Sequence, residues 1–275
     1  EQFPAVKLLK IIDLRLSPLL TDQSAVVLAT MPSLRAVRVS GVNKLNNYQL
    51  AVEPGDTSDT RVFYVTPSGA LNRGNAYYTI APGDDKHDGL TYRKPKATLQ
   101  DVFDDYDLGP TDVVVLETGA HATGGVLTAA DEGALYLGSL GGATLSDLRL
   151  ENADHNYFHN VNFASNSPGL TLFGSDNNVI DLADFFGTGI NLEINDSDNN
   201  LIDRSTFGGP GNGLQILGDN NDDAAGNLIT RSEFQNQQTS VAILSYEVNT
   251  LENNAFTGNG ATGIHLGPGV PALVL

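Results

Sequence analysis

A repeat of about 22 residues runs from Asp154 to Gly267 and restricts the fold more than any other feature of the sequence. Phenylalanines and asparagines recur together, each asparagine standing seven residues before its phenylalanine. The pairs are Asn156 and Phe163, Asn178 and Phe185, Asn200 and Phe207, Asn227 and Phe234, and Asn249 and Phe256. The one longer step coincides with an insertion at residues 219–224. A fixed period in this range is typical of a solenoid.

Each repeat unit holds short apolar runs at strand spacing, separated by Gly, Asn, Asp and Ser, and none holds a helix-length amphipathic pattern. Coils of parallel strands stack about 4.8 Å apart, so that equivalent residues lie above one another. The sequence therefore predicts an internal stack of phenylalanine rings. It also predicts a ladder of asparagine side chains that hydrogen-bond along the solenoid axis.

The repeat form Asn-x-Ile…Phe…Gly-Ile-x-Leu resembles that of right-handed parallel β-helix proteins of the pectin-lyase-like superfamily, found in large secreted or cell-surface bacterial proteins. Residues 83–99 and 112–119 are similar to the segment that precedes the repeats in that family, so the resemblance covers roughly residues 61–267. It implies an all-β fold of about 22 residues per coil, with a capping helix at the N-terminal mouth. The pattern Leu99, Val102, Phe103, Tyr106 places this helix at residues 99–106.

Three parts are expected along the chain. Residues 1–60 lie outside the repeat, and their alternating pattern suits a small antiparallel β region of four strands with a linker at 54–59. Residues 61–120 are expected to form the N-terminal cap and first coil, and 121–275 the β-helix. Because the segment after the fifth repeat is apolar, we expect more coils or a partner to follow it in the natural protein.

The composition excludes some partners. The net charge of −18 opposes binding to nucleic acid and to anionic membranes. The chain has no cysteine, which removes disulfides and thiolate metal sites, and it has no apolar run long enough to span a membrane. The first residues are not a signal peptide. We expect a processed or excised piece of a bacterial extracellular or cell-surface protein.

The best acid–base candidates are His155, Tyr157 and His159, which alternation places on one side of a strand near Arg149. Arg204 and Arg231 each fall four residues after their repeat asparagine and stack in adjacent coils, where a lyase would use them to bind carboxylates. The alternative is a solvated outward column, with the arginines paired to Asp181, Asp203 or Glu233. The residues favour this alternative, so we assign no catalytic residue.

Acidic residues gather in the turns and suggest calcium. Asp154, Asp176 and Asp198 recur at one position of successive coils, where their mutual repulsion would favour a bound cation. The candidate Ca²⁺ ligands are Asp176, Asp196, Asp198, Asp219 and Asp223. The alternative is a solvated edge that keeps the solenoid soluble.

Three classes of function remain open at this point. The favoured one is a structural or adhesive module of a larger extracellular protein, binding other modules or copies of itself. The second is a polysaccharide lyase, epimerase or hydrolase. The third is a glycan-binding surface, for which a polar column of Thr171, Asn191 and Gln215 would serve, with Tyr136 and Tyr246 as the main candidates for exposed aromatic residues.

Overall fold

The computed structural model describes residues 11–13, 36–38, 61–69, 77–121, 124–165, 168–218, 224–260 and 262–270. The chain divides into two compact units, Glu1–Val62 and Phe63–Leu275. In the first unit, β1 (Ile11–Asp13) and β2 (Ala36–Arg38) pair in parallel. The antiparallel arrangement expected for this region is therefore wrong for these two strands. The 22 residues between them are long enough for the crossover that a parallel pair needs, and the other two expected strands lie outside the described residues.

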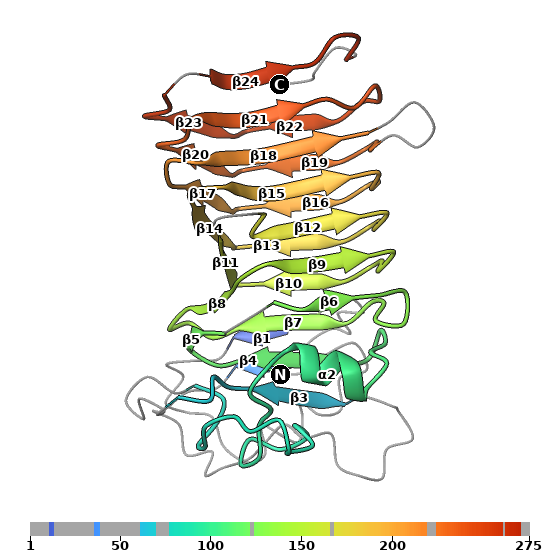
Figure 1. Cartoon of the computed structure of the whole chain (residues 1–275), viewed down its shortest axis with the longest axis vertical. Coiled ribbons are helices and arrows are strands. Elements are labelled where there is room, and N and C mark those ends of the chain that lie inside the picture. The colour runs from blue at the N-terminus through green and yellow to red at the C-terminus, as the bar shows by residue number, and fades with distance from the viewer. Residues whose placement is uncertain are drawn as a thin grey trace, which may run out of the picture. The chain divides into compact units, whose positions relative to one another are not determined.

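The second unit is a right-handed parallel β-solenoid of three sheets (Figure 1), as the repeat predicted. Sheet 1 holds β3 (Val62–Val65), β4 (Val113–Leu116), β7 (Leu135–Gly138), β10 (Tyr157–His159), β13 (Val179–Asp181), β16 (Leu201–Asp203), β19 (Leu228–Thr230) and β22 (Thr250–Glu252). Sheet 2 holds β5 (Gly119–Ala120), β8 (Ala143–Leu145), β11 (Val161–Ser165), β14 (Asp184–Gly187), β17 (Thr206–Gly208), β20 (Glu233–Gln235) and β23 (Ala255–Thr257). Sheet 3 holds β6 (Val126–Leu127), β9 (Leu148–Glu151), β12 (Leu170–Phe173), β15 (Ile190–Asn195), β18 (Asn212–Leu217), β21 (Thr239–Ile243) and β24 (Thr262–Leu266).

The bend from sheet 1 into sheet 2 includes a residue in the left-handed region of backbone space. This residue is Asn160, Leu182, Arg204, Arg231 or Asn253 in successive coils, with φ between 48° and 56°. Asparagine tolerates this conformation better than branched or bulky residues do. Leucine and arginine therefore adopt it here under the constraint of the stacked coils. The two arginines consequently start from equivalent corners of neighbouring coils.

The core of the solenoid is a continuous aromatic column. Ring centres of Phe163, Phe185, Phe207, Phe234 and Phe256 follow one another at 5.0, 4.5, 4.5 and 5.0 Å, in near-parallel stacks. The first four rings are fully buried or nearly so, and Phe256 is partly buried in the last described coil. The predicted phenylalanine stack is confirmed. It lies among leucine and isoleucine columns from the other two sheets.

The asparagine column is also confirmed, and its geometry is specific. The side-chain Oδ1 of each asparagine accepts the backbone N–H of its counterpart in the preceding coil, at 2.8–3.1 Å. Asn200 and Asn227 also donate Nδ2–H to the amide oxygen of the next asparagine. All of these side chains are buried, so the ladder satisfies backbone groups that the turn would otherwise leave unpaired.

The expected helix is α2 (Gln100–Asp105), which lies at the N-terminal end of the solenoid (Figure 1). Its Val102 and Phe103 belong to the buried core. Next to this end, the fully buried carboxylate of Glu117 accepts backbone N–H groups of Tyr77, Tyr78, Thr79 and Thr118 at 2.6–2.9 Å. Glu117 thus ties the segment before the first coil to the end of β4.

Candidate functional site

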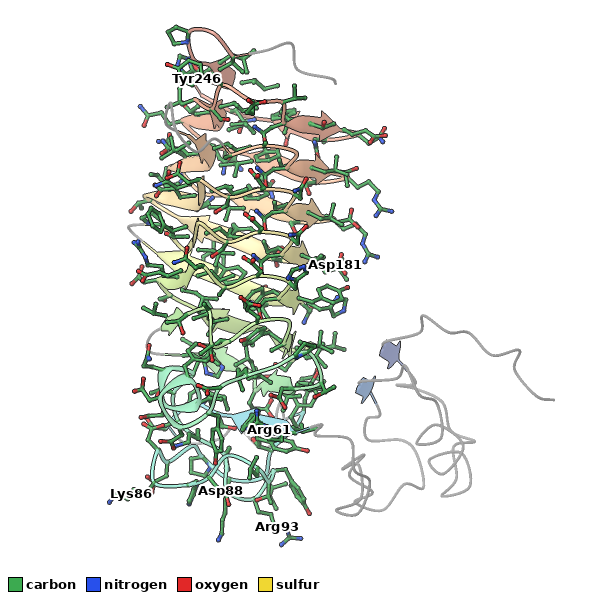
Figure 2. All side chains as sticks on the ribbon, turned by 90° about the vertical axis from the view of Figure 1, so that its right-hand side faces the viewer. Arg61, Lys86, Asp88, Arg93, Asp181 and Tyr246 are labelled. Carbon is green, nitrogen blue, oxygen red and sulfur yellow. The ribbon has the colours of Figure 1, made fainter. Side chains whose placement is uncertain are left out.

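The charged residues singled out from the sequence meet on the outward face of sheet 1. In-register pairing of β10, β13 and β16 places His159, Asp181 and Asp203 in one column that runs along the axis. Tyr157 lies on the same face of β10, two residues before His159. Figure 2 shows Asp181 on the flank of the solenoid, partway along its length. Here the structure brings together four of the five predicted candidates, Tyr157, His159, Arg204 and Arg231.

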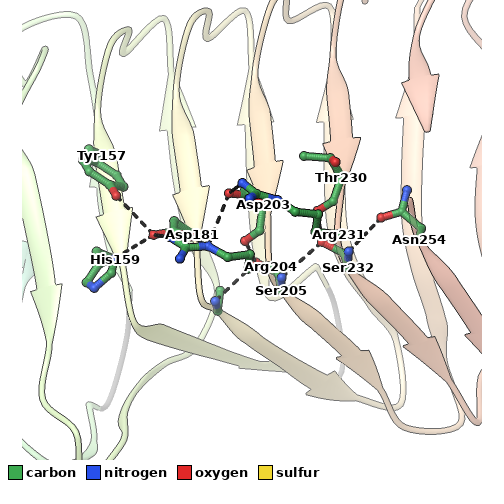
Figure 3. Close-up of polar contacts among 11 residues, drawn as sticks. Tyr157, His159, Asp181, Asp203, Arg204, Ser205, Thr230, Arg231, Ser232 and Asn254 are labelled. Atoms are coloured by element: carbon green, nitrogen blue, oxygen red, sulfur yellow. Dashed lines mark hydrogen bonds and ion pairs between the residues drawn. The ribbon is translucent and has the colours of Figure 1, made fainter. Parts of the chain in front are cut away.

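Asp181 is the centre of this group (Figure 3). Its Oδ2 accepts hydrogen bonds from His159 Nδ1 at 2.8 Å and from the Tyr157 hydroxyl at 3.2 Å. Arg204 approaches from the next coil and binds the carboxylate in a bidentate manner, with Nε to Oδ1 at 2.9 Å and Nη2 to Oδ2 at 2.7 Å. The Asp181 side chain is only 3% exposed, whereas that of Arg204 is 47% exposed. The carboxylate is therefore enclosed and fully engaged.

The same arrangement recurs one coil further along. Arg231 binds Asp203 through both Nε and Nη2, with Nε 2.8 Å from Oδ1. Arg204 Nε also lies 3.4 Å from Asp203 Oδ2, so the two pairs are linked. The interpretation of these arginines as partners of Asp181 and Asp203 is confirmed. The bidentate geometry is the one that gives arginine–carboxylate pairs their strength.

The pKa values on this face follow from these contacts. Burial tends to raise the pKa of Asp181, but the hydrogen bonds from His159 and Arg204 and the charge of Arg204 hold it below its usual value. Burial, followed by the neighbouring charge of Asp181, raises the pKa of Tyr157 to about 12. Near neutral pH, Asp181 is thus an ionised, paired carboxylate and Tyr157 is a neutral hydrogen-bond donor.

His155 does not join this group, which corrects the expectation from strand alternation. It lies before β10 rather than in it, with a φ of 60°, and its side chain is exposed. Its backbone N–H donates to Asp176 O at 3.0 Å in the adjoining turn. The left-handed residue breaks the alternation on which the expectation rested.

The acidic turns are bonded within the fold in a way that the charge argument missed. Asp154 Oδ1 accepts the backbone N–H of Asp176, Asp176 Oδ1 that of Asp198, and Asp198 Oδ1 that of Ala225, each at 2.7 Å. Charge-assisted bonds to N–H groups offset repulsion between stacked carboxylates. Each of these carboxylates thus links its turn to the turn of the next coil.

These contacts do not support the calcium proposal. Asp196 lies in a turn with a φ of 47°, and Asp219 and Asp223 lie outside the described residues. Among the residues that the structure describes, no group of three or more His, Cys, Asp or Glu side chains could hold a metal ion. The candidate ligands Asp176 and Asp198 are instead part of the turn ladder described above.

A second outward cluster, on sheet 3, was missed by the sequence analysis. Arg149 Nε lies 2.5 Å from Glu151 Oε1, and its guanidinium carbon lies 5.2 Å from the ring centre of Phe173, which is 37% exposed. Strand pairing puts Arg149, Thr171 and Glu193 in one column. Burial raises the pKa of Glu193, against the opposing charge of Arg149. The signal that could have found the cluster is the 22-residue step from Thr171 to Glu193.

The structure corrects two expectations about the glycan-binding surface, one on its polar column and one on its aromatic residues. The partner of Thr171 is Glu193 rather than Asn191, and Gln215 follows Glu193 as expected for the column. Asn191 is buried and donates Nδ2–H to Gly208 O at 3.0 Å. Tyr136 is fully buried in the core, whereas Tyr246 is 48% exposed at the C-terminal end of the solenoid (Figure 2).

Comparisons with known proteins agree with this architecture. Residues 124–269 match the family model described as "Periplasmic copper-binding protein (NosD)". A crystal structure of pectate lyase Pel9A is similar, with a TM-score of 0.54 and 15% sequence identity. The similarity covers 75% of this chain and 62% of the pectate lyase chain, and at this identity it shows a shared fold. No curated protein matches the chain. In the described part of the chain, no helix has the length and apolar character needed to cross a membrane.

Proposed function

The chain belongs to the family described as periplasmic copper-binding protein (NosD), and from that premise we propose that it is a non-catalytic structural or adhesive module of a larger bacterial protein. Its place is outside the cytoplasm, in agreement with the periplasmic description of the family. Its partners are other modules or further copies of the same protein. The stacked hydrogen-bonded columns support this role because they make a stiff rod from short repeats.

One observation carries the proposal: Asp181, Tyr157, Arg204 and Arg231 are already bound to one another or to Asp203 in contacts between coils. A general base must be unprotonated and free to reach its substrate. Asp181 is ionised, but its two oxygens already accept four hydrogen bonds from His159, Tyr157 and Arg204. A Tyr157 pKa of about 12 keeps that hydroxyl protonated near neutral pH. The guanidinium groups of Arg204 and Arg231 bind aspartates of the same chain rather than a substrate.

A second candidate function is glycan binding at the sheet 3 cluster of Arg149, Phe173 and Glu193. An exposed aromatic ring next to groups that can hydrogen-bond to sugar hydroxyls supports it. Arg149 has its Nε 2.5 Å from Glu151 Oε1, whereas Arg204 binds Asp181 through two nitrogens. The net charge of −18 opposes polyanions and favours a neutral glycan.

Both candidates are tested by incubating the chain with polygalacturonate, alginate and neutral glucans, and measuring unsaturated uronate, reducing ends and binding. We expect no turnover on any polymer. Turnover that is lost in a folded His159→Ala variant would contradict the non-catalytic proposal. If the glycan candidate holds, binding of a neutral glucan falls in Phe173→Ala and persists in Phe186→Ala, a matched control 44% exposed on sheet 2.

A further inference from the structure

The copper-binding description of the family does not fit the residues of this chain. We infer that the β-helix of this member holds no copper, and that the face of sheet 1 where a histidine and carboxylates meet is closed to metal ions by arginines. The inference concerns the described residues of the second unit, and it rests on the donors present, on their positions in the coils, and on what each donor already binds.

Sulfur donors are missing from the relevant sequence. Cuprous ions favour thiolate and thioether ligands, whereas cupric ions favour imidazole and oxygen ligands in a tetragonal arrangement. The chain has no cysteine, and its single methionine, Met31, precedes the solenoid. Residues 124–269, which match the family model, therefore offer histidine and oxygen ligands but no sulfur.

The histidines of the matched segment lie apart. They are His155, His159 and His265. His155 is exposed in a turn, while His159 lies on sheet 1. His265 lies in β24 of sheet 3, four coil steps beyond, which is about 19 Å at 4.8 Å per coil. A metal ion within about 2 Å of each ligand atom cannot join His265 to the other two.

The best remaining donors, His159 and Asp181, are blocked by a fixed positive charge. The guanidinium of Arg204 binds both oxygens of Asp181, and that of Arg231 binds both oxygens of Asp203. Arginine remains protonated at any pH at which the protein is folded. A cupric ion at Asp181 would have to displace this cation and leave it beside another, which costs Coulomb energy.

Two histidines of the second unit precede the matched segment: His87, whose Nδ1 lies 3.0 Å from Pro95 O, and His121. His121 is buried, and its Nδ1 has no hydrogen-bond partner among the described residues. Its Nε2 lies 3.0 Å from Glu117 O. The nearby Glu117 carboxylate is occupied by the backbone N–H groups that it accepts. His121 is thus a single imidazole without a second ligand, and a lone imidazole does not retain copper against a chelator.

The test loads the whole chain with Cu(II), and separately with Cu(I) under ascorbate, and then removes loosely held metal with a competing chelator. Metal content is measured by mass spectrometry, and cupric coordination by electron paramagnetic resonance. His121→Ala, His159→Ala and Met31→Leu variants are treated in the same way. We expect far less than one equivalent of copper on the wild type and no difference between it and the histidine variants.

One equivalent of copper that survives the chelator and is lost in His159→Ala or His121→Ala would overturn the inference. Retained copper that depends on no residue of these variants but shows imidazole nitrogen in its electron paramagnetic resonance spectrum would also overturn it, because all five histidines of the chain lie in the second unit. Copper that is lost only in Met31→Leu would place the metal in the first unit and would leave the inference for the solenoid standing. Circular dichroism of each variant confirms that a lost signal is not a lost fold.

Discussion

Replacing Phe207 with alanine should lower the free energy of unfolding by about 3–5 kcal/mol. The ring is fully buried and stacks at 4.5 Å on both Phe185 and Phe234. Neighbouring coils are held by their own hydrogen bonds and cannot collapse into the space left by the ring, so a cavity remains. Chemical denaturation of the wild type and the variant measures the loss.

Phe186→Ala is the matched control for this prediction. Phe186 follows Phe185 on β14 but points outward and is 44% exposed. Its removal leaves no internal cavity and should change the free energy of unfolding by no more than about 0.5 kcal/mol. Equal losses in Phe207→Ala and Phe186→Ala would mean that the phenylalanine column is not the core.

A Glu117→Gln substitution should cost about 3 kcal/mol or more, although it hardly changes the shape of the side chain. Four backbone N–H groups point at the carboxylate oxygens of Glu117. Glutamine offers one oxygen, and its amide N–H₂ would face donors instead of accepting from them. Hydrogen bonds to charged groups contribute about 1.5–3 kcal/mol each, and two or more are lost.

The exposed Glu132 supplies the comparison for Glu117. A Glu132→Gln variant should melt as the wild type does, because its side chain is not enclosed by N–H donors. In Glu117→Gln, backbone hydrogen exchange should rise first at residues 77–79, which the carboxylate ties down. Wild-type stability and exchange in that variant would rule out the role assigned to Glu117.

The solenoid could be predicted from the sequence because stacking repeats the same environment in every coil. A buried phenylalanine or asparagine is needed at the same position each time, so the period itself reports the fold. Asn200 and Phe207 illustrate this, since each is bonded or stacked to its counterparts 22 residues before and 27 residues after. The strands before and after the insertion keep their register, since β16 pairs with β19 and β18 pairs with β21.

The site was harder to predict, because its contacts depend on the number of residues between neighbouring strands and on the direction of backbone N–H groups. Gly189 follows its repeat phenylalanine more closely than Gly169 does. Aligning the two glycines therefore pairs Thr171 with Asn191, two residues before its true partner Glu193. Counting carboxylates indicated repulsion, but could not show that Asp154 and Asp176 each accept an N–H from the next coil. Charge counts carry no information on N–H direction.

The coupling free energy between Arg204 and Asp181 tests most directly the central claim that the outward charges of sheet 1 hold coils together. It comes from denaturation of the wild type, Arg204→Gln, Asp181→Asn and the double variant. At pH 7 we expect about 1 kcal/mol, toward the low end of coupled pairs because Arg204 is half exposed. Since folding lowers the pKa of Asp181, this stabilisation is present above the unfolded-state pKa of about 3.9 and is lost as pH falls through the folded-state value. A coupling of zero at pH 7, or one that stays unchanged in acid, would contradict the account.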